Sequence, residues 1–124
     1  YYIYYHDLEV EDEELYLTLS IYAPNDDGEY DYKIYFSKSD DNGATWTTPL
    51  EVSDSNTASR NMYPKMDVDG SDVHISWLGS PSGTDHSVYY STSSNGGSSF
   101  NTGSQLSGTA YTIDVDVTSN GNNI

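Results

Sequence analysis

Residues 39–46 read Ser-Asp-Asp-Asn-Gly-Ala-Thr-Trp, and residues 93–100 read Ser-Ser-Asn-Gly-Gly-Ser-Ser-Phe. The second segment follows the first at a shift of 93 − 39 = 54 positions and has a similar residue at each key place. A short aromatic run precedes each segment, Ile-Tyr-Phe-Ser at 34–37 and Val-Tyr-Tyr-Ser at 88–91. An internal repeat of this length is typical of proteins built from stacked supersecondary units.

The sequence around these segments alternates between apolar and polar residues. In 15–22, Leu and Ile at every second position alternate with Tyr, Thr and Ser, which favours a strand over the helix that acidic residues 11–14 could begin. Similar short runs cover 33–39, 65–69, 73–77, 87–93 and 112–118. Clusters of Gly, Pro, Asn, Asp and Ser separate them, at 24–28, 41–43, 79–83, 95–97 and 120–121. This pattern predicts an all-β protein.

A repeat of about 50 residues with about four short strands is the pattern of a β-propeller blade. The sequence therefore predicts a propeller fragment with two four-stranded antiparallel blades, at 1–53 and 54–107, and the first strand of a third at 108–124. The expected inner strand repeats as His-Asp-Leu-Glu at 6–9, Met-Asp-Val-Asp at 66–69 and Ile-Asp-Val-Asp at 113–116, with shifts of 60 and 47.

Residues 39–46 match the pattern Ser-x-Asp-x-Gly-x-Thr-Trp at every specified position, and residues 93–100 are a softened copy. The motif resembles the Asp box of the bacterial-neuraminidase-repeat β-propellers, a family of sialidases and many non-enzymatic relatives. The resemblance covers essentially the whole chain and implies that each box hairpin links the two outer strands of a blade. The matching residues are Ser39, Asp41, Gly43, Thr45 and Trp46 in the first box, and Ser93, Asn95, Gly97, Ser99 and Phe100 in the second.

The residue types of the box predict a structural role. Asp41 can accept hydrogen bonds from backbone N–H groups of its own turn, and Gly43 suits a position with positive φ. Ser39 and Thr45 can tie the two arms of the turn together, and Trp46 can fill the space between neighbouring sheets. Asp41 is therefore not expected to act as a catalytic acid.

A sialidase-like activity would require three Arg, a Tyr–Glu pair and an Asp, as the resemblance implies. The chain contains a single Arg, Arg60, which precedes the second expected inner strand. Arg60 is a candidate ligand contact, and the alternative is an exposed Arg that offsets the acidic charge. His6, His74 and His86 do not have the spacing of a zinc site, and the chain has no Gly-x-Ser-x-Gly elbow, phosphate loop or dinucleotide fingerprint.

Charge excludes two classes of partner. With 20 acidic and 4 basic residues the net charge is −16, so the chain lacks the cationic surface that nucleic acids and anionic membranes require. High salt, divalent cations or simple solvation can each make such self-repulsion tolerable.

Three pairs of carboxylates are candidate cation ligands. Carboxylates two residues apart on one strand share a face, and such oxygen ligands suit Ca²⁺. The alternative is that these carboxylates are solvated polar residues that bind no cation. The pairs are Asp7/Glu9, Asp67/Asp69 and Asp114/Asp116.

Composition predicts an extracellular or cell-surface location, since 13 Tyr accompany abundant Ser, Thr, Asn and Gly. No apolar run approaches the roughly 18 residues of a membrane span. The sequence opens with Tyr and ends within the expected third blade, so we expect part of a longer protein, or a chain completed by identical copies. The expected function is non-catalytic adhesion, assembly or glycan contact. The alternative is a fragment of a sialidase-like glycoside hydrolase whose catalytic residues lie elsewhere.

Overall fold

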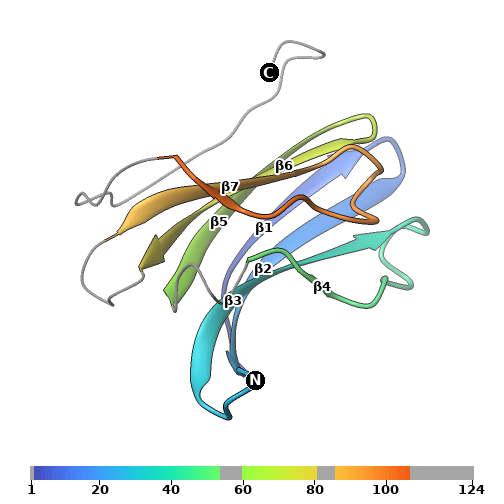
Figure 1. Cartoon of the computed structure of the whole chain (residues 1–124). Helices are drawn as coiled ribbons and strands as arrows, with labels where there is room; N and C mark the ends of the chain where they lie inside the picture. Colours follow the sequence, from blue (N-terminus) through green and yellow to red (C-terminus); the bar gives the residue numbers. More distant parts are fainter. Residues whose placement is uncertain (1, 54–59, 81–85, 107–124) are drawn as a thin grey trace.

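A computed structural model describes residues 2–53, 60–80 and 86–106, and the regular structure in these ranges is entirely β-strand (Figure 1). The all-β prediction is confirmed. In the described residues no helix has the length and apolar character needed to cross a membrane. The predicted strand at 112–118 lies outside the described residues. The strands are β1 (Tyr2–Glu11), β2 (Glu14–Pro24), β3 (Tyr30–Ser39), β4 (Leu50–Glu51), β5 (Arg60–Asp69), β6 (Asp72–Ser80), β7 (Ser87–Ser93) and β8 (Ser104–Gln105).

The strands form two antiparallel meanders. β1 to β4 pair in chain order, and β5 to β8 do the same. We call them the first and the second meander. In the part of the chain that the structure describes, a single parallel residue pair, Tyr32 with Arg60, connects β3 to β5. Through this pair the eight strands make one open sheet of order β1-β2-β3-β5-β6-β7-β8, with β4 beside β3.

The first meander turns one face toward the second. Because side chains alternate along a strand, β2 and β3 place every second residue on this inner face, where Thr18 is paired with Phe36 and Ser20 with Ile34. All of these side chains are buried, as is Tyr16 on the same face. The inner face of the first meander is thus defined by Tyr16, Thr18, Ser20, Ile34 and Phe36.

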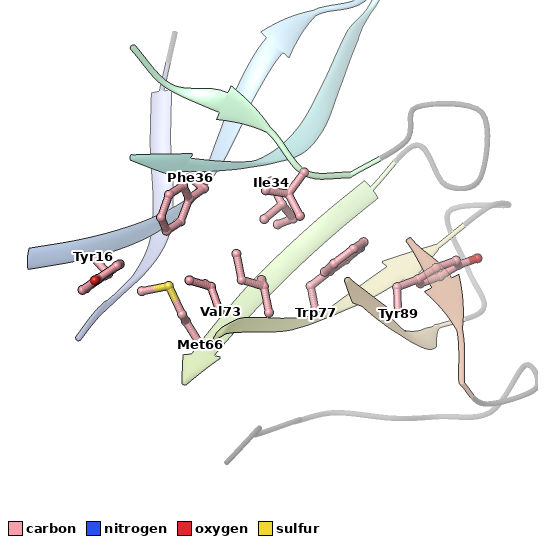
Figure 2. Packing of buried hydrophobic residues seen from close by; sticks show 9 residues of the cluster. Tyr16, Ile34, Phe36, Met66, Val73, Trp77 and Tyr89 are labelled. Atoms are coloured by element: carbon pink, nitrogen blue, oxygen red, sulfur yellow. The ribbon is translucent and has the colours of Figure 1, made fainter. Parts of the chain in front are cut away.

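The second meander meets this inner face with apolar side chains. Figure 2 shows Ile34 and Phe36 on one side, and Met66, Val73 and Trp77 on the other. Full burial of one large apolar side chain contributes about 1.5–3 kcal/mol, so this contact supplies much of the stability of the pair. The covered face of the second meander consists of Met66, Val73, Ile75, Trp77 and Tyr89, all buried.

A buried polar link accompanies the apolar contact. The indole N–H of Trp77 donates to Asn61 Oδ1 at 2.9 Å, and the Asn61 amide donates to the Tyr32 carbonyl at 3.1 Å. The Ser20 hydroxyl donates to the carbonyl of Asn61 at 2.7 Å. Buried polar groups favour the fold only when they are paired, and here the pairing joins β2 and β3 to β5 and β6.

The pairing also defines which positions of the two meanders correspond. Leu8 pairs with Leu17 in the first meander, and Met66 pairs with Ile75 in the second. Met66 therefore corresponds to Leu8, a shift of 66 − 8 = 58, whereas the sequence predicted a shift of 60 for this strand. The predicted shift of 54 holds for the third strand, where Tyr35 pairs with Leu19 and Tyr89 with Trp77.

Candidate functional site

The first box forms a hydrogen-bonded turn between β3 and β4. Asp41 Oδ1 accepts from the backbone N–H of Thr45 at 2.8 Å, and Oδ2 accepts from the Thr45 hydroxyl at 2.6 Å. Ser39 Oγ donates to Asp41 at 2.8 Å and accepts from the N–H of Gly43 at 2.8 Å. Gly43 has φ of +88°, and its carbonyl accepts from the Trp46 indole at 3.2 Å. Every motif residue therefore contributes to the turn.

The second box repeats these bonds with other residues, between β7 and β8. Ser93 Oγ donates to Asn95 Oδ1 at 2.7 Å and accepts from the N–H of Gly97 at 2.9 Å. Asn95 Oδ1 accepts from the backbone N–H of Ser99 at 3.0 Å, and the Asn95 amide donates to the Ser99 hydroxyl at 2.8 Å. Asn thus replaces Asp by donating to the hydroxyl group instead of accepting from it.

The electrostatics of Asp41 agree with a structural role. The Thr45 hydroxyl, then the Thr45 backbone N–H and the Ser39 hydroxyl, hold the pKa of Asp41 below its ordinary value. A general acid working near neutral pH needs a raised pKa. Asp41 is instead an ionised acceptor whose oxygens are occupied by its own turn.

The second turn packs against the first meander through Phe36. The ring centroids of Phe36 and Phe100 are 5.1 Å apart in an edge-to-face arrangement. A Cβ atom on Gly97 would lie 2.1 Å from Cε1 of Phe36, so the ring occupies the space that only glycine leaves open. The first turn has no such cover: Trp46, predicted to be buried between blades, is 40% exposed. No described residue covers the indole as Phe36 covers the second turn, so the expected packing of Trp46 between sheets stays a prediction.

Burial and hydrogen bonding change the titration of a group next to the first turn. Burial, then a hydrogen bond to Glu14, raises the pKa of Tyr16 to about 12. Lys38 lies 3.1 Å from Glu14 and 3.1 Å from Asp40. The hydrogen bond from Tyr16 and the contact with Lys38 hold the pKa of Glu14 below its ordinary value. This cluster ties β2 to β3 near the turn.

The predicted carboxylate pairs do not gather into a cation site in the described residues. Asp7 Oδ2 accepts from the backbone N–H of Met66 at 2.9 Å, which ties β1 to β5. By the register of the two meanders, Asp67 and Asp69 correspond to Glu9 and Glu11 and not to Asp7 and Glu9. Within 2–53, 60–80 and 86–106, no three acidic or His side chains could hold a metal ion together. Asp114 and Asp116 lie outside the described residues, so the calcium hypothesis stays a prediction.

Arg60 lies at the start of β5 and is exposed. Its backbone forms the single parallel pair with Tyr32 and pairs with Ser80 of β6. The side chain therefore lies where the two meanders join, close in sequence to an aromatic group that the sequence did not single out.

That group is a set of tyrosines from four strands at one end of the sheet. Tyr4 and Tyr5 come from β1, Tyr22 from β2, Tyr30 and Tyr32 from β3, and Tyr63 from β5. We call these six residues the tyrosine surface. Neighbouring ring centroids lie 4.2 to 6.4 Å apart along the series Tyr63, Tyr5, Tyr4, Tyr32, Tyr22, Tyr30. Tyr4 and Tyr30 are each more than half exposed.

The tyrosine surface contains a hollow and a strained residue. A hollow of about 310 Å³ is lined by Tyr4, Tyr5, His6, Tyr63, Pro64 and Lys65. Tyr63 has φ of +56°, a left-handed conformation that is unusual for a residue with a large side chain. Its hydroxyl accepts from that of Tyr5 at 3.2 Å, and this bond, followed by partial burial, raises the pKa of Tyr5.

Only part of this surface has a signal in the sequence. Tyr30 and Tyr32 lie two residues apart, which places them on one face of β3. This alternation shows which residues share a face but not which strands are neighbours, so the sequence does not predict the rest of the surface.

Comparison of the chain with protein-family models, curated proteins and solved structures found no match. The Asp-box resemblance therefore rests on the sequence of this chain, chiefly on residues 39–46 and 93–100.

Proposed function

We propose that this chain is a non-catalytic β-propeller module of the Asp-box type that acts outside the cell in adhesion, assembly or glycan contact. In this proposal each meander is one blade, and the module completes its ring with further blades of a longer protein or with identical copies. The observation that carries the proposal is that the two meanders have equivalent faces. The face of the second meander is buried against the first meander, whereas the equivalent face of the first meander is exposed.

The second meander is covered at positions where the first is not. Met66 and Ile75, buried against the first meander, correspond to Leu8 and Leu17. Leu8 is 49% exposed and the neighbouring Val10 is 60% exposed. Soluble proteins rarely leave a contiguous apolar sheet face to solvent. The outer face of the first meander, defined by Leu8, Val10, Leu15, Leu17 and Leu19, therefore suits another unit that presents an inner face.

The box turns support the same assembly. Phe36 of the first meander packs over Gly97 and against Phe100 in the second. The corresponding residues of the first turn, Gly43 and Trp46, would receive an aromatic ring from a preceding unit. Among the described residues, the Cβ position of Gly43 approaches Leu15 and Trp46, at 3.2 and 3.9 Å, and no ring lies over it as Phe36 lies over Gly97.

The topology is compatible with blades. Each meander has four antiparallel strands in chain order, and the box joins the third to the fourth in both. Propellers arrange such sheets around an axis, so that each packs on the next. A sialidase-like site would require three Arg, so if this chain were a fragment of such a hydrolase, at least two of them would lie outside it.

Sedimentation velocity tests the proposal. A charge of −16 opposes association at low salt, so the chain should be studied at about 0.15 M and at about 1 M salt. At about 1 M the screening length falls to about 3 Å. We expect the chain to associate at the higher salt, and Leu8→Gln with Val10→Thr to weaken that association. Leu106→Gln is the matched control, because Leu106 is 63% exposed and lies outside the outer face.

Two outcomes would contradict the proposal. The first is a compact, stable monomer of the wild-type chain at both salt concentrations. The second is association that Leu106→Gln weakens as much as the outer-face variant does. Neutral substitutions are used so that the net charge, and with it the general repulsion between chains, stays the same.

A further inference from the structure

We propose that the tyrosine surface binds a neutral oligosaccharide. This inference deepens the glycan-contact part of the proposed function by naming its site and its ligand class. It rests on the packing, strain and charge of residues in β1, β2, β3 and β5, and not on the box turns.

The first argument is chemical complementarity. A neutral sugar ring has apolar C–H faces and hydroxyl edges, and a tyrosine offers an aromatic face together with one hydroxyl group. In the tyrosine surface these features repeat over six rings, three of which, Tyr4, Tyr30 and Tyr63, are exposed by 52%, 54% and 37%. The row therefore offers a series of stacking positions to a chain of sugar rings.

The second argument is shape. The hollow of about 310 Å³ beside Tyr4, Tyr5 and Tyr63 lies at the lower end of the range for small-molecule sites, about 300–1,000 Å³. A hollow of this size suits one sugar unit. The rings of Tyr32, Tyr22 and Tyr30 continue the surface away from it, which favours an oligosaccharide over a monosaccharide.

The third argument is backbone strain at Tyr63. A left-handed conformation disfavours every residue with a Cβ, and glycine adopts it freely. The chain nevertheless has tyrosine at φ of +56°, where β5 departs from regular pairing between Met62 and Lys65. The ring of Tyr63 is held 4.2 Å from that of Tyr5 by this conformation. Strain of this kind is concentrated at functional sites, and here its effect is to place a ring at the hollow.

The fourth argument is charge. The net charge of −16 repels an anionic saccharide, and the lining of the hollow includes one ammonium group, that of Lys65. Recognition of a carboxylate usually uses the paired donors of Arg, and Arg60, although its backbone pairs with Tyr32, is not among the residues that line the hollow. The tyrosine surface presents hydroxyl groups and aromatic faces, which favour an uncharged ligand.

The experiment titrates the whole chain with neutral hexasaccharides, cellohexaose, xylohexaose, mannohexaose and chitohexaose, and with sialyllactose as the anionic probe. Calorimetry measures affinity with and without Ca²⁺. We expect at least one neutral hexasaccharide to bind, sialyllactose to bind more weakly, and Tyr4→Ala to reduce affinity about tenfold, the factor that 1.4 kcal/mol represents. Tyr4→Phe keeps the ring and should stay close to wild type.

Tyr63→Gly separates binding from folding. Glycine removes the ring and also the strain at φ of +56°, so we expect an unchanged or higher denaturation midpoint together with about tenfold weaker binding. Trp46→Ala is the control for an exposed aromatic residue outside the tyrosine surface, and it should leave binding unchanged.

Four results would overturn the inference: no binding of any neutral hexasaccharide, tighter binding of sialyllactose, equal binding by Tyr4→Ala and wild type, or binding of a decaproline peptide in place of saccharides. The sedimentation experiment on the outer face is independent. If no neutral hexasaccharide binds but the chain associates at high salt, the proposed assembly stands. If a neutral hexasaccharide binds but the chain stays a monomer, only the proposed assembly is rejected.

Discussion

Substitution of Gly97 by alanine tests the contact between the two meanders most directly. Gly97 has φ of +87°, and an added Cβ would lie 2.1 and 2.3 Å from two atoms of the Phe36 ring. The left-handed conformation costs an alanine about 1–2 kcal/mol, and forcing a methyl group into a packed site costs about 1–3 kcal/mol more. We therefore expect Gly97→Ala to lower the free energy of unfolding by about 2–5 kcal/mol.

Two other glycines with positive φ are matched controls. Gly96 has φ of +68° with open space at its Cβ position, so Gly96→Ala should cost only the conformational part, about 1–2 kcal/mol. Gly43 of the first turn has φ of +88°, and the atom closest to its Cβ position is the end of the flexible Leu15 side chain at 3.2 Å. Gly43→Ala should therefore resemble Gly96→Ala.

Urea unfolding at 25 °C, followed by fluorescence and circular dichroism, measures these differences through the transition midpoint and slope. Phe36→Leu removes the two ring atoms that would clash, so in a double-mutant cycle with Gly97→Ala it should recover about 1–3 kcal/mol relative to additivity. Equal destabilisation by Gly97→Ala and Gly96→Ala, with no coupling to Phe36, would refute the face-to-face packing of the meanders.

Two further predictions concern single bonds. Trp77→Phe removes the indole N–H that donates to Asn61. We expect the lost bond and the space left behind to lower the free energy of unfolding by about 2–4 kcal/mol. A loss below about 0.5 kcal/mol, the scale of a surface substitution, would show that the bond is unimportant. The pKa of Asp41 is lower in the folded chain than in the unfolded chain, so its contribution is present above about pH 3.9 and is lost as the pH falls through the folded value. Asp41→Asn, which copies Asn95, should flatten this part of the acid-unfolding curve; an unchanged curve would contradict the structural role of the carboxylate.

The box turns were predictable from sequence because their bonds are local. Ser39, Asp41 and Thr45 lie within seven consecutive residues, and the turn uses their side chains on its own backbone. The same bonds at Ser93 and Asn95 follow from the repeat alone. Local hydrogen bonding of this kind depends little on what the rest of the chain does.

The register of the first strand was not predictable in the same way. The repeat in the sequence makes Asp67 equivalent to Asp7, whereas the strand pairing makes it equivalent to Glu9. A shift of two residues leaves every side chain on the same face, so apolar alternation is equally good for shifts of 58 and 60. The length of the β1–β2 and β5–β6 turns decides the register, and that became visible only with the strands in place.

Exposure of particular aromatic residues also depends on neighbours. Trp77 is fully buried, because it lies in the core between the two meanders together with Ile34 and Phe36. Trp46 remains 40% exposed, since the corresponding cover for its own meander is not among the described residues. The tyrosine surface depends in the same way on which strand ends meet, and no local pattern shows that Tyr63 of β5 lies beside Tyr5 of β1.

The contact between the two meanders joins different surfaces, with Phe36 on one side and Trp77 on the other. A heterologous contact of this kind has no intrinsic end, in contrast to a two-fold one. Repeated with a constant rotation, it closes when the rotations add up to a full turn and otherwise continues as an open helical array. In the proposed assembly, the angle between the two meanders would therefore set the symmetry, and a substitution that changes this angle would change the number of units needed to close a ring.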